Sequence, residues 1–108
     1  MRIRWLRTAL RNLDEEATYI ATDDAAAARL VVDRIFKSVA QLALQPGLGR
    51  PGRVPGTREL IVPRTRYIVP YRVRGDVVEI LRVFHTSRRP AAALVGRHND
   101  RTIYRPRP

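Results

Sequence analysis

The chain has 108 residues and a formal net charge of +11, with 44% hydrophobic and 29% charged residues. This length matches one domain with its own core and is too short for two, and the composition excludes an intrinsically disordered chain. Cysteine is absent, which excludes disulfides and thiolate metal sites. Charge follows residues 1–6 at once, with no apolar run long enough for a signal peptide or a membrane span, so we expect a cytoplasmic protein with no membrane contact.

The positive charge is concentrated in the second half of the chain. Residues 1–56 carry nine Lys or Arg against six Asp or Glu, whereas residues 57–108 carry twelve against four. Twenty of the 21 basic residues are Arg, and guanidinium groups make bidentate contacts with phosphates and carboxylates. A GC-rich genome explains the Arg:Lys ratio equally well, but it does not explain the excess charge. The composition therefore indicates an acidic partner.

In chain order, the alternation of polar and apolar residues from Arg2 to Trp5 predicts a short, half-buried strand. Thr8 is the expected N-cap of a first helix. Its apolar residues recur at three- and four-residue spacing and form one stripe, consisting of Leu10, Leu13, Ala17 and Ile20. The acidic residues Asp14, Glu15 and Glu16 are expected on the solvent side of this helix, without a chemical role.

Thr22-Asp23-Asp24 interrupts the pattern and offers capping side chains for a second helix, so the two helices should form an antiparallel hairpin. The second helix is predicted from about Ala25 to Leu44, where Gln45-Pro46-Gly47 ends it. Residues 48–56 hold three Gly and two Pro and are expected to form a loop. The predicted core-facing residues of the second helix are Ala28, Val31, Val32, Ile35, Val39 and Leu42.

Three runs of β-branched and aromatic residues, 57–62, 66–73 and 77–85, predict an antiparallel meander. Arg74-Gly75-Asp76 provides a tight turn between the last two runs, because Gly accepts a positive φ. The last run is apolar at odd and even positions, as expected for an interior strand covered on both faces. Pro70 lies inside the middle run and has no amide donor, so we expect a bulge or locally edge-like pairing there.

These elements follow the order β-α-α-β-β-β and predict an α+β fold, in which the helical hairpin packs on one face of a mostly antiparallel four-stranded sheet. The first strand should lie beside a strand of the meander. The side chains expected under the helices are Tyr67, Val69, Tyr71 and Val73. Residues 1–95 are assigned to this domain and residues 96–108 to a basic, flexible C-terminal tail.

Basic side chains gather at one end of the predicted sheet. Antiparallel pairing about the Gly75-Asp76 turn places Arg66 opposite His85, and a bulge at Pro70 would move Arg66 opposite a neighbour of His85. Arg88 and Arg89 follow directly in the sequence. A solvated strand end with a structural histidine explains the same residues, so both interpretations stay open. We expect a target-binding cluster consisting of Arg66, His85, Arg88 and Arg89.

The ordered set of elements resembles the RelE/ParE toxin superfamily over residues 1 to about 90. Besides the strand and the two helices, the resemblance rests on the Leu48-Gly49-Arg50-Pro51 loop, the strand from Tyr67 to Val73, the Gly75-Asp76 turn and the strand from Val78 to His85 with its trailing arginines. It implies the toxin of a type II toxin–antitoxin pair, which causes growth arrest and forms a hetero-oligomer with a small antitoxin, usually encoded alongside. It implies no cofactor and no metal. The expected antitoxin-binding residues are Arg72, Arg74 and Arg82.

The superfamily divides by target. Members similar to RelE cut messenger RNA on the ribosome, and this reaction needs a base and cations on the phosphate. If the chain resembled them in function, its catalytic residues would be Arg66, His85 and Arg88. However, the mid-strand arginine of these nucleases falls at Ile68 and their loop glutamate at Gly52, and their terminal tyrosine has no clear match in this chain.

Members similar to ParE poison DNA gyrase by contact and need no catalytic set. The departures at Ile68 and Gly52 therefore favour a ParE-like gyrase inhibitor, without enzymatic activity of its own, over a RelE-like ribosome-dependent ribonuclease. A third interpretation is a non-enzymatic basic nucleic-acid-binding module, in which arginines contact phosphates while Tyr67 and Tyr71 stack on bases. It is the weakest of the three, because alternating aromatic residues in a sheet usually belong to the core.

Overall fold

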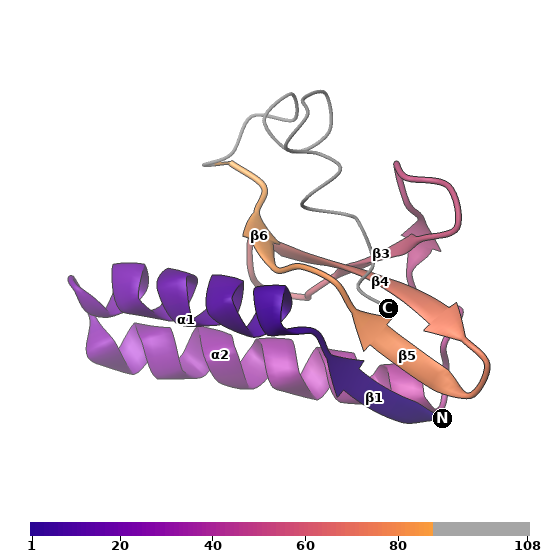
Figure 1. Cartoon of the computed structure of the whole chain (residues 1–108). Helices are drawn as coiled ribbons and strands as arrows, with labels where there is room; N and C mark the ends of the chain where they lie inside the picture. Colours follow the sequence, from indigo (N-terminus) through magenta and orange to yellow (C-terminus); the bar gives the residue numbers. More distant parts are fainter. Residues whose placement is uncertain (88–108) are drawn as a thin grey trace.

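The computed structural model describes residues 1–87. Figure 1 shows a pair of helices lying alongside each other, with a sheet beside them. The helices are α1 (Arg7–Ala21) and α2 (Ala25–Ala40), followed by a short 3-10 helix, η1 (Gln41–Ala43). The strands are β1 (Arg2–Trp5), β2 (Arg50–Pro51), β3 (Arg58–Ile61), β4 (Tyr67–Arg74), β5 (Val77–Ile80) and β6 (Phe84–His85).

The sheet has the order β1-β5-β4-β3-β2, and β6 also pairs with β4. β1 runs parallel to β5, while every other pair is antiparallel. The α+β class, the packed helical hairpin and the position of the first strand beside the meander are thus confirmed. The predicted number of four strands is wrong, because the run at residues 77–85 divides into β5 and β6, and because Arg50–Pro51 of the predicted loop pairs with β3.

An irregularity in the sheet lies next to Pro70, as expected. In the β4–β5 pair, Arg74 faces Val77, and the numbers of facing residues add up to 151. In the β4–β6 pair, Tyr67 faces His85, and the numbers add up to 152. Segment 81–83, between β5 and β6, therefore contains one extra residue. The amide of Leu81 donates to the carbonyl of Pro70 at 2.9 Å. Since the N and C=O of a strand residue point to the same side, the missing amide of Pro70 faces the segment where the ladder breaks.

The hydrophobic core lies between the helices and one face of the sheet. It consists of Ala9, Leu13, Ile35, Val39, Leu42, Leu60, Val62, Tyr67, Val69, Tyr71, Val78, Ile80 and Val83. Burial of each large side chain contributes about 1.5–3 kcal/mol. The residues of the second helix that were predicted to face the core are mostly buried, although Val31 and Val32 are only half-buried. Val73 was expected under the helices but is 41% exposed, and it lies one residue before the end of β4, next to the β4–β5 turn.

The first helix differs from its prediction in two respects. It begins at Arg7, and its N-cap is Leu6, which makes no side-chain capping bond, so the predicted Thr8 cap is wrong. Leu10 is 46% exposed, whereas Asn12 and Glu16 are buried, so the buried stripe is rotated relative to the predicted one. Glu16 therefore does not face solvent as expected. The second helix starts as predicted, with the Asp24 carboxylate accepting from the amide of Ala27 at 3.0 Å, but it changes to a 3-10 helix after Ala40.

The loop after η1 is fixed to the sheet by Tyr71. The hydroxyl of this fully buried side chain accepts from the amide of Gly49 at 2.8 Å and donates to the carbonyl of Pro46 at 2.7 Å. Burial raises the pKa of Tyr71 above its ordinary value. Within residues 1–87, no helix has the length and apolar character needed to cross a membrane.

This close packing predicts a difference between two glycines of the loop. A methyl group at Gly49 would lie 2.7 Å from the ring of Tyr71 and 2.9 Å from the carbonyl oxygen of Glu59, whereas a methyl group at Gly47 would meet nothing within 4 Å. Gly49→Ala should lower the free energy of unfolding by about 1–3 kcal/mol. Gly47→Ala should change it by less than about 0.5 kcal/mol. Urea denaturation of the two variants measures both values, and equal stabilities would contradict this packing.

Candidate basic site at the end of the sheet

The predicted Arg66–His85 cluster forms at the end of the sheet where β4 begins and β6 ends. Tyr67 pairs with His85, and the amide of Thr86 donates to the carbonyl of Arg66 at 2.9 Å. Arg66 therefore lies opposite Thr86 rather than His85, which is one of the two positions predicted for a bulge at Pro70. Figure 1 shows β6 close to α1, and the two elements are in contact.

His85 lies between the core and solvent. Its ring meets the ring of Tyr67 edge to face, with 5.2 Å between centroids, and its Nδ1 accepts from the amide of Ser87 at 3.0 Å. Burial, and to a smaller extent the positive charge of Arg66, lower the pKa of His85 below its ordinary value. The imidazole is consequently neutral near pH 7, and since Nδ1 is an acceptor, the proton of the neutral ring resides on Nε2.

Arg66 supplies the charge of this strand end. Its side chain is exposed, and Nη1 donates to the hydroxyl oxygen of Ser87 at 3.2 Å. A guanidinium has five N–H donors, so this one bond orients the group and leaves most donors facing solvent. Arg66 can therefore contact a carboxylate or a phosphate of a partner. The other two predicted members, Arg88 and Arg89, lie outside the described residues, as does the predicted tail at 96–108.

Two buried polar side chains of α1 hold this strand end in place. Oε1 of Glu16 accepts from the hydroxyl of Tyr67 at 2.9 Å, and Oδ1 of Asn12 accepts from the amide of Val83 at 3.2 Å. These bonds fix the chain shortly before His85 and the ring against which His85 packs. The burial of these two residues was not predicted from the sequence. The signal was their spacing of four residues on the same helix face as Ala9 and Leu13.

The positions where the ribonuclease groups were expected are occupied by packing contacts. Ile68 is 4% exposed and packs against Phe84, while the guanidinium of Arg53 lies 5.7 Å from the centroid of the Phe84 ring. A side chain at Gly52 would overlap the hydroxyl of Thr57. Tyr67 and Tyr71 are 3% and 0% exposed, so they cannot stack on bases as the nucleic-acid module required. No cluster of metal-binding side chains is found within residues 1–87.

The predicted antitoxin-binding arginines differ in their surroundings. Nε of Arg72 donates to Oε1 of Glu79 at 2.6 Å, and the Arg72 side chain is only 11% exposed. Arg82 is also buried, and only Arg74 is exposed. Glu79 has a second, longer contact with Arg4 at 3.8 Å. Arg72 thus contributes to the fold itself, because a buried carboxylate needs a cation beside it.

The other buried carboxylate on this sheet face has the same arrangement. Glu59 is 1% exposed and lies between Arg50, at 3.1 Å, and Arg53, at 3.5 Å. Its Oε2 also accepts from the amide of Arg53 at 3.3 Å, which ties the loop between β2 and β3 to the sheet. Part of the arginine excess is therefore structural.

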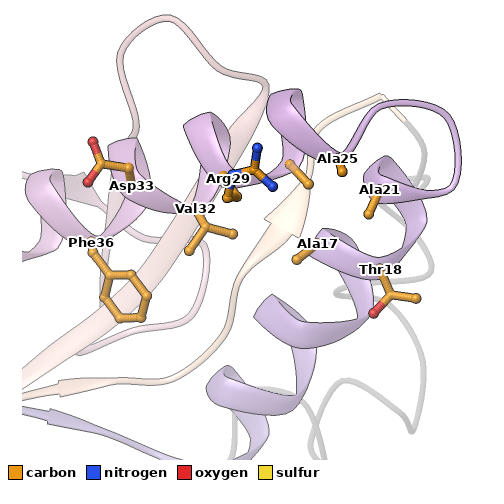
Figure 2. Close-up of a pocket in the computed structure, with 9 residues that line it drawn as sticks. Ala17, Thr18, Ala21, Ala25, Arg29, Val32, Asp33 and Phe36 are labelled. Atoms are coloured by element: carbon orange, nitrogen blue, oxygen red, sulfur yellow. The ribbon is translucent and has the colours of Figure 1, made fainter.

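A separate hollow of about 550 Å³ lies between the helices. Figure 2 shows that small apolar side chains of both helices face it, with one charged residue of each sign among them. Its labelled lining residues are Ala17, Thr18, Ala21, Ala25, Arg29, Val32, Asp33 and Phe36. The hollow offers an apolar contact surface and no set of groups for catalysis.

The Arg72–Glu79 pair can be tested by a matched substitution. Arg72→Met leaves the buried Glu79 with only the longer contact to Arg4, so we expect the free energy of unfolding to fall by about 3–5 kcal/mol. Arg74→Met, two residues further along the same strand at an exposed position, should change it by less than about 0.5 kcal/mol. Chemical denaturation at pH 7 gives both values. An equally stable Arg72→Met protein would show that the pair with Glu79 does not stabilise the fold.

The link between Arg66 and His85 predicts a titration result. Arg66→Gln removes one of the two causes of the lowered pKa, so the His85 pKa should rise part of the way toward about 6.5. Arg64→Gln, an exposed arginine in the preceding turn, should leave it unchanged. NMR titration of the imidazole measures this pKa directly. An unchanged His85 pKa in Arg66→Gln would show that the charge of Arg66 does not act on the imidazole.

The same shift determines the sign of a pH effect on stability. The folded-state pKa of His85 lies below its unfolded value of about 6.5, so the unfolded chain takes up this proton first as the pH falls. The contribution of His85 to stability is therefore complete above pH 6.5 and is lost as the pH falls toward the folded-state pKa.

Comparison with known proteins identifies the family of this chain. Residues 3–90 match the family described as the ParE toxin of the type II toxin–antitoxin system parDE. Y4kP of Sinorhizobium fredii, whose name describes it as a candidate toxin, is 54% identical over 84 residues, which cover 78% of this chain and 86% of that protein.

Two solved toxin–antitoxin systems have similar structures. A chain of the chromosomal ParDE system from P. aeruginosa matches with a TM-score of 0.72 and 32% identity, over 81% of this chain and 97% of that one. A chain of the RelBE2 toxin–antitoxin complex from Mycobacterium tuberculosis matches with a TM-score of 0.51 and 26% identity, over 78% and 88%. The chain described here thus belongs to the ParE toxin family of type II toxin–antitoxin systems.

Proposed function

We propose that this ParE-type toxin arrests growth by inhibiting DNA gyrase through contact, and that a small antitoxin neutralises it. The observation that carries the choice of target is the packing at Ile68. Where the ribonuclease members of the superfamily are expected to hold a phosphate-binding arginine, this chain has an apolar side chain packed against Phe84. A toxin that acts by contact loses nothing through this change, whereas a ribonuclease loses a cation at the phosphate.

The contact surface in this proposal is the strand end with Arg66 and His85, extended by Arg88 and Arg89. Arg66 is exposed, oriented by Ser87, and has unused donors that suit an acidic group of the target. The neutral imidazole of His85 lies next to it. The proposal requires no cofactor and no chemical step by the toxin, and it places the protein in the cytoplasm with gyrase.

An antitoxin partner is supported by charge and by the relatives. The two matched structures come from a ParDE system and from a RelBE2 toxin–antitoxin complex. The net charge of +11 suits an acidic partner that covers the basic surface. We expect the two chains to form a hetero-oligomer.

A RelE-like ribonuclease is the second candidate, and one observation favours it. A histidine with a lowered pKa beside an arginine is a suitable general base at neutral pH, and His85 with Arg66 has this arrangement. Arg88 would join them in a catalytic set. The packed positions at Ile68 and Gly52 are the reason why this candidate ranks below gyrase inhibition.

Inhibition assays with the purified protein distinguish the two targets. We expect it to block DNA supercoiling by gyrase and, in cells, to induce the DNA-damage response while messenger RNA stays intact at first. Arg66→Glu and the double variant Arg88→Glu/Arg89→Glu should each lose at least about 90% of the inhibition. Arg66 is exposed, so its substitution should change the free energy of unfolding by less than about 0.5 kcal/mol. Arg29→Glu, on α2, is the matched control and should stay active.

Two outcomes would contradict this proposal. Ribosome-dependent cleavage of messenger RNA that disappears in His85→Ala, with gyrase unaffected, would replace gyrase by the ribosome as the target. Full inhibition by a folded Arg88→Glu/Arg89→Glu protein would move the contact surface away from this strand end.

A further inference from the structure

The turn between β3 and β4 contains an arginine in a strained backbone conformation. Arg64 has a φ of 60°, which lies in the left-handed region, and no other non-glycine residue within 1–87 has a positive φ. Glycine and asparagine adopt this conformation more readily than a residue with a long side chain. Such strain persists only where the surrounding structure imposes it, and strained residues gather at functional sites. The turn therefore presents a charged side chain at a position where a smaller residue would fit the backbone better.

Hydrogen bonds on both sides of Arg64 hold the turn in this shape. The hydroxyl of Thr65 donates to the carbonyl of Val62 at 2.9 Å and accepts from the amide of Tyr67 at 3.0 Å. From α2, Nη1 of Arg34 donates to the carbonyl of Arg64 at 3.1 Å. The turn is thus bonded to the end of β3, to the start of β4 and to a helix, so it is organised before any partner binds.

Three arginines meet at this turn without a carboxylate. Arg64 and Arg66 are exposed, and Arg34 is half-buried. Within residues 1–87, none of the three forms an ion pair, and residues 62–67 contain no Asp or Glu. The Cα atoms of Arg64 and Arg66 are at most about 7 Å apart, because the two residues are separated by one other. Two exposed guanidinium groups and a third cation therefore form one small surface, the turn surface.

We propose that the turn surface binds the phosphate backbone of duplex DNA. The guanidinium groups of Arg64 and Arg66 donate to phosphate oxygens, while Arg34 adds a third positive charge and holds the strained turn in place. Contacts of this kind position a protein on DNA without reading the base sequence. Their affinity comes from the counterions that the arginines release from the DNA, so it depends strongly on the salt concentration.

Two observations favour a duplex over an acidic protein or a single strand. The exposed residues of the turn are Pro63, Arg64 and Arg66, whereas a protein interface usually has an apolar centre. The neighbouring aromatic side chains, Tyr67 and Tyr71, are buried and cannot stack on unpaired bases. A duplex presents its phosphates without requiring stacking, so it fits the turn surface best.

The choice of DNA over RNA rests on the proposed function, because DNA is the duplex on which gyrase acts. The inference deepens that proposal by giving the toxin a contact with the DNA that gyrase holds. Arg66 belongs to the contact surface proposed above, and Arg64 and Arg34 extend this surface to the β3–β4 turn and α2. The toxin then binds the enzyme and its DNA with neighbouring groups.

Binding of the full chain to a fluorescently labelled duplex, in the absence of gyrase, tests the inference. We expect a Kd of about 1–100 μM at physiological salt, as for other sequence-independent DNA contacts. In Arg64→Asn, the slope of log Kd against log salt concentration should fall by about 0.9, because one phosphate contact is lost. Arg74→Asn, with the same change in charge at the opposite end of β4, should keep the wild-type slope.

The Arg64→Asn variant also separates binding from folding. Asparagine tolerates the left-handed conformation, so this variant should unfold at the same urea concentration as the wild-type chain or at a higher one. Arg66→Gln provides a second measurement at a position with no positive φ, and its slope should fall by the same amount. A wild-type slope in both variants would overturn the inference.

Further outcomes identify what has failed. Equal losses of slope in Arg64→Asn and Arg74→Asn would show that overall charge, and not the turn surface, binds DNA, and would overturn the inference. Duplex RNA or polyglutamate bound at least as tightly as duplex DNA would assign the turn surface to RNA or to an acidic protein, with the same consequence. No binding of duplex DNA at about 100 μM would overturn the inference and leave gyrase inhibition, which is measured separately, in place.

Discussion

The hydrogen bond from the hydroxyl of Tyr67 to the buried Glu16 is the contact on which the basic strand end depends. A carboxyl group inside a core is costly unless it is bonded, so this position on α1 has to lie against the start of β4. The Tyr67 ring then provides the surface on which His85 packs, and Asn12 fixes the backbone at Val83 one helical turn away. The helix thus sets the position of the strand end through polar contacts, while the apolar stripe supplies the bulk of the stabilisation.

The charges of this protein serve two different purposes. On the sheet face opposite the helices, Glu59 and Glu79 are buried and each is flanked by two arginines, so removal of one arginine affects the fold. At the strand end, the exposed guanidinium of Arg66 retains free donors and can meet a partner. A count of arginines cannot separate these groups. The separation depends on which arginines lie opposite a carboxylate in the register of the sheet.

Local patterns in the sequence were sufficient for the class of the fold, because the second helix, the Gly75 turn and the β-branched runs each have a distinct period or a breaker residue. The first helix was misjudged, since its buried face includes Asn12 and Glu16, and a hydrophobic pattern cannot register a buried polar residue. The position of Arg66 opposite a neighbour of His85 followed from turn arithmetic and the proline at 70. The same arithmetic places Arg72 opposite Glu79 on the adjacent strand, but the burial of this pair did not follow, because it depends on the packing around that face of the sheet.

The parallel pairing of β1 with β5 joins the two ends of the folded region, since Arg2 lies opposite Val77. A chain emerging from the ribosome can form the helical hairpin early from local contacts, but β1 stays unpaired until the last full strand has been made. The hydrogen-bond partners of Asn12 and Glu16 also lie late in the chain, at residues 83 and 67, respectively. The basic strand end is therefore assembled only when synthesis of the domain is nearly complete. A partial translation product has helices but no site, so the order of folding itself delays the activity of the toxin.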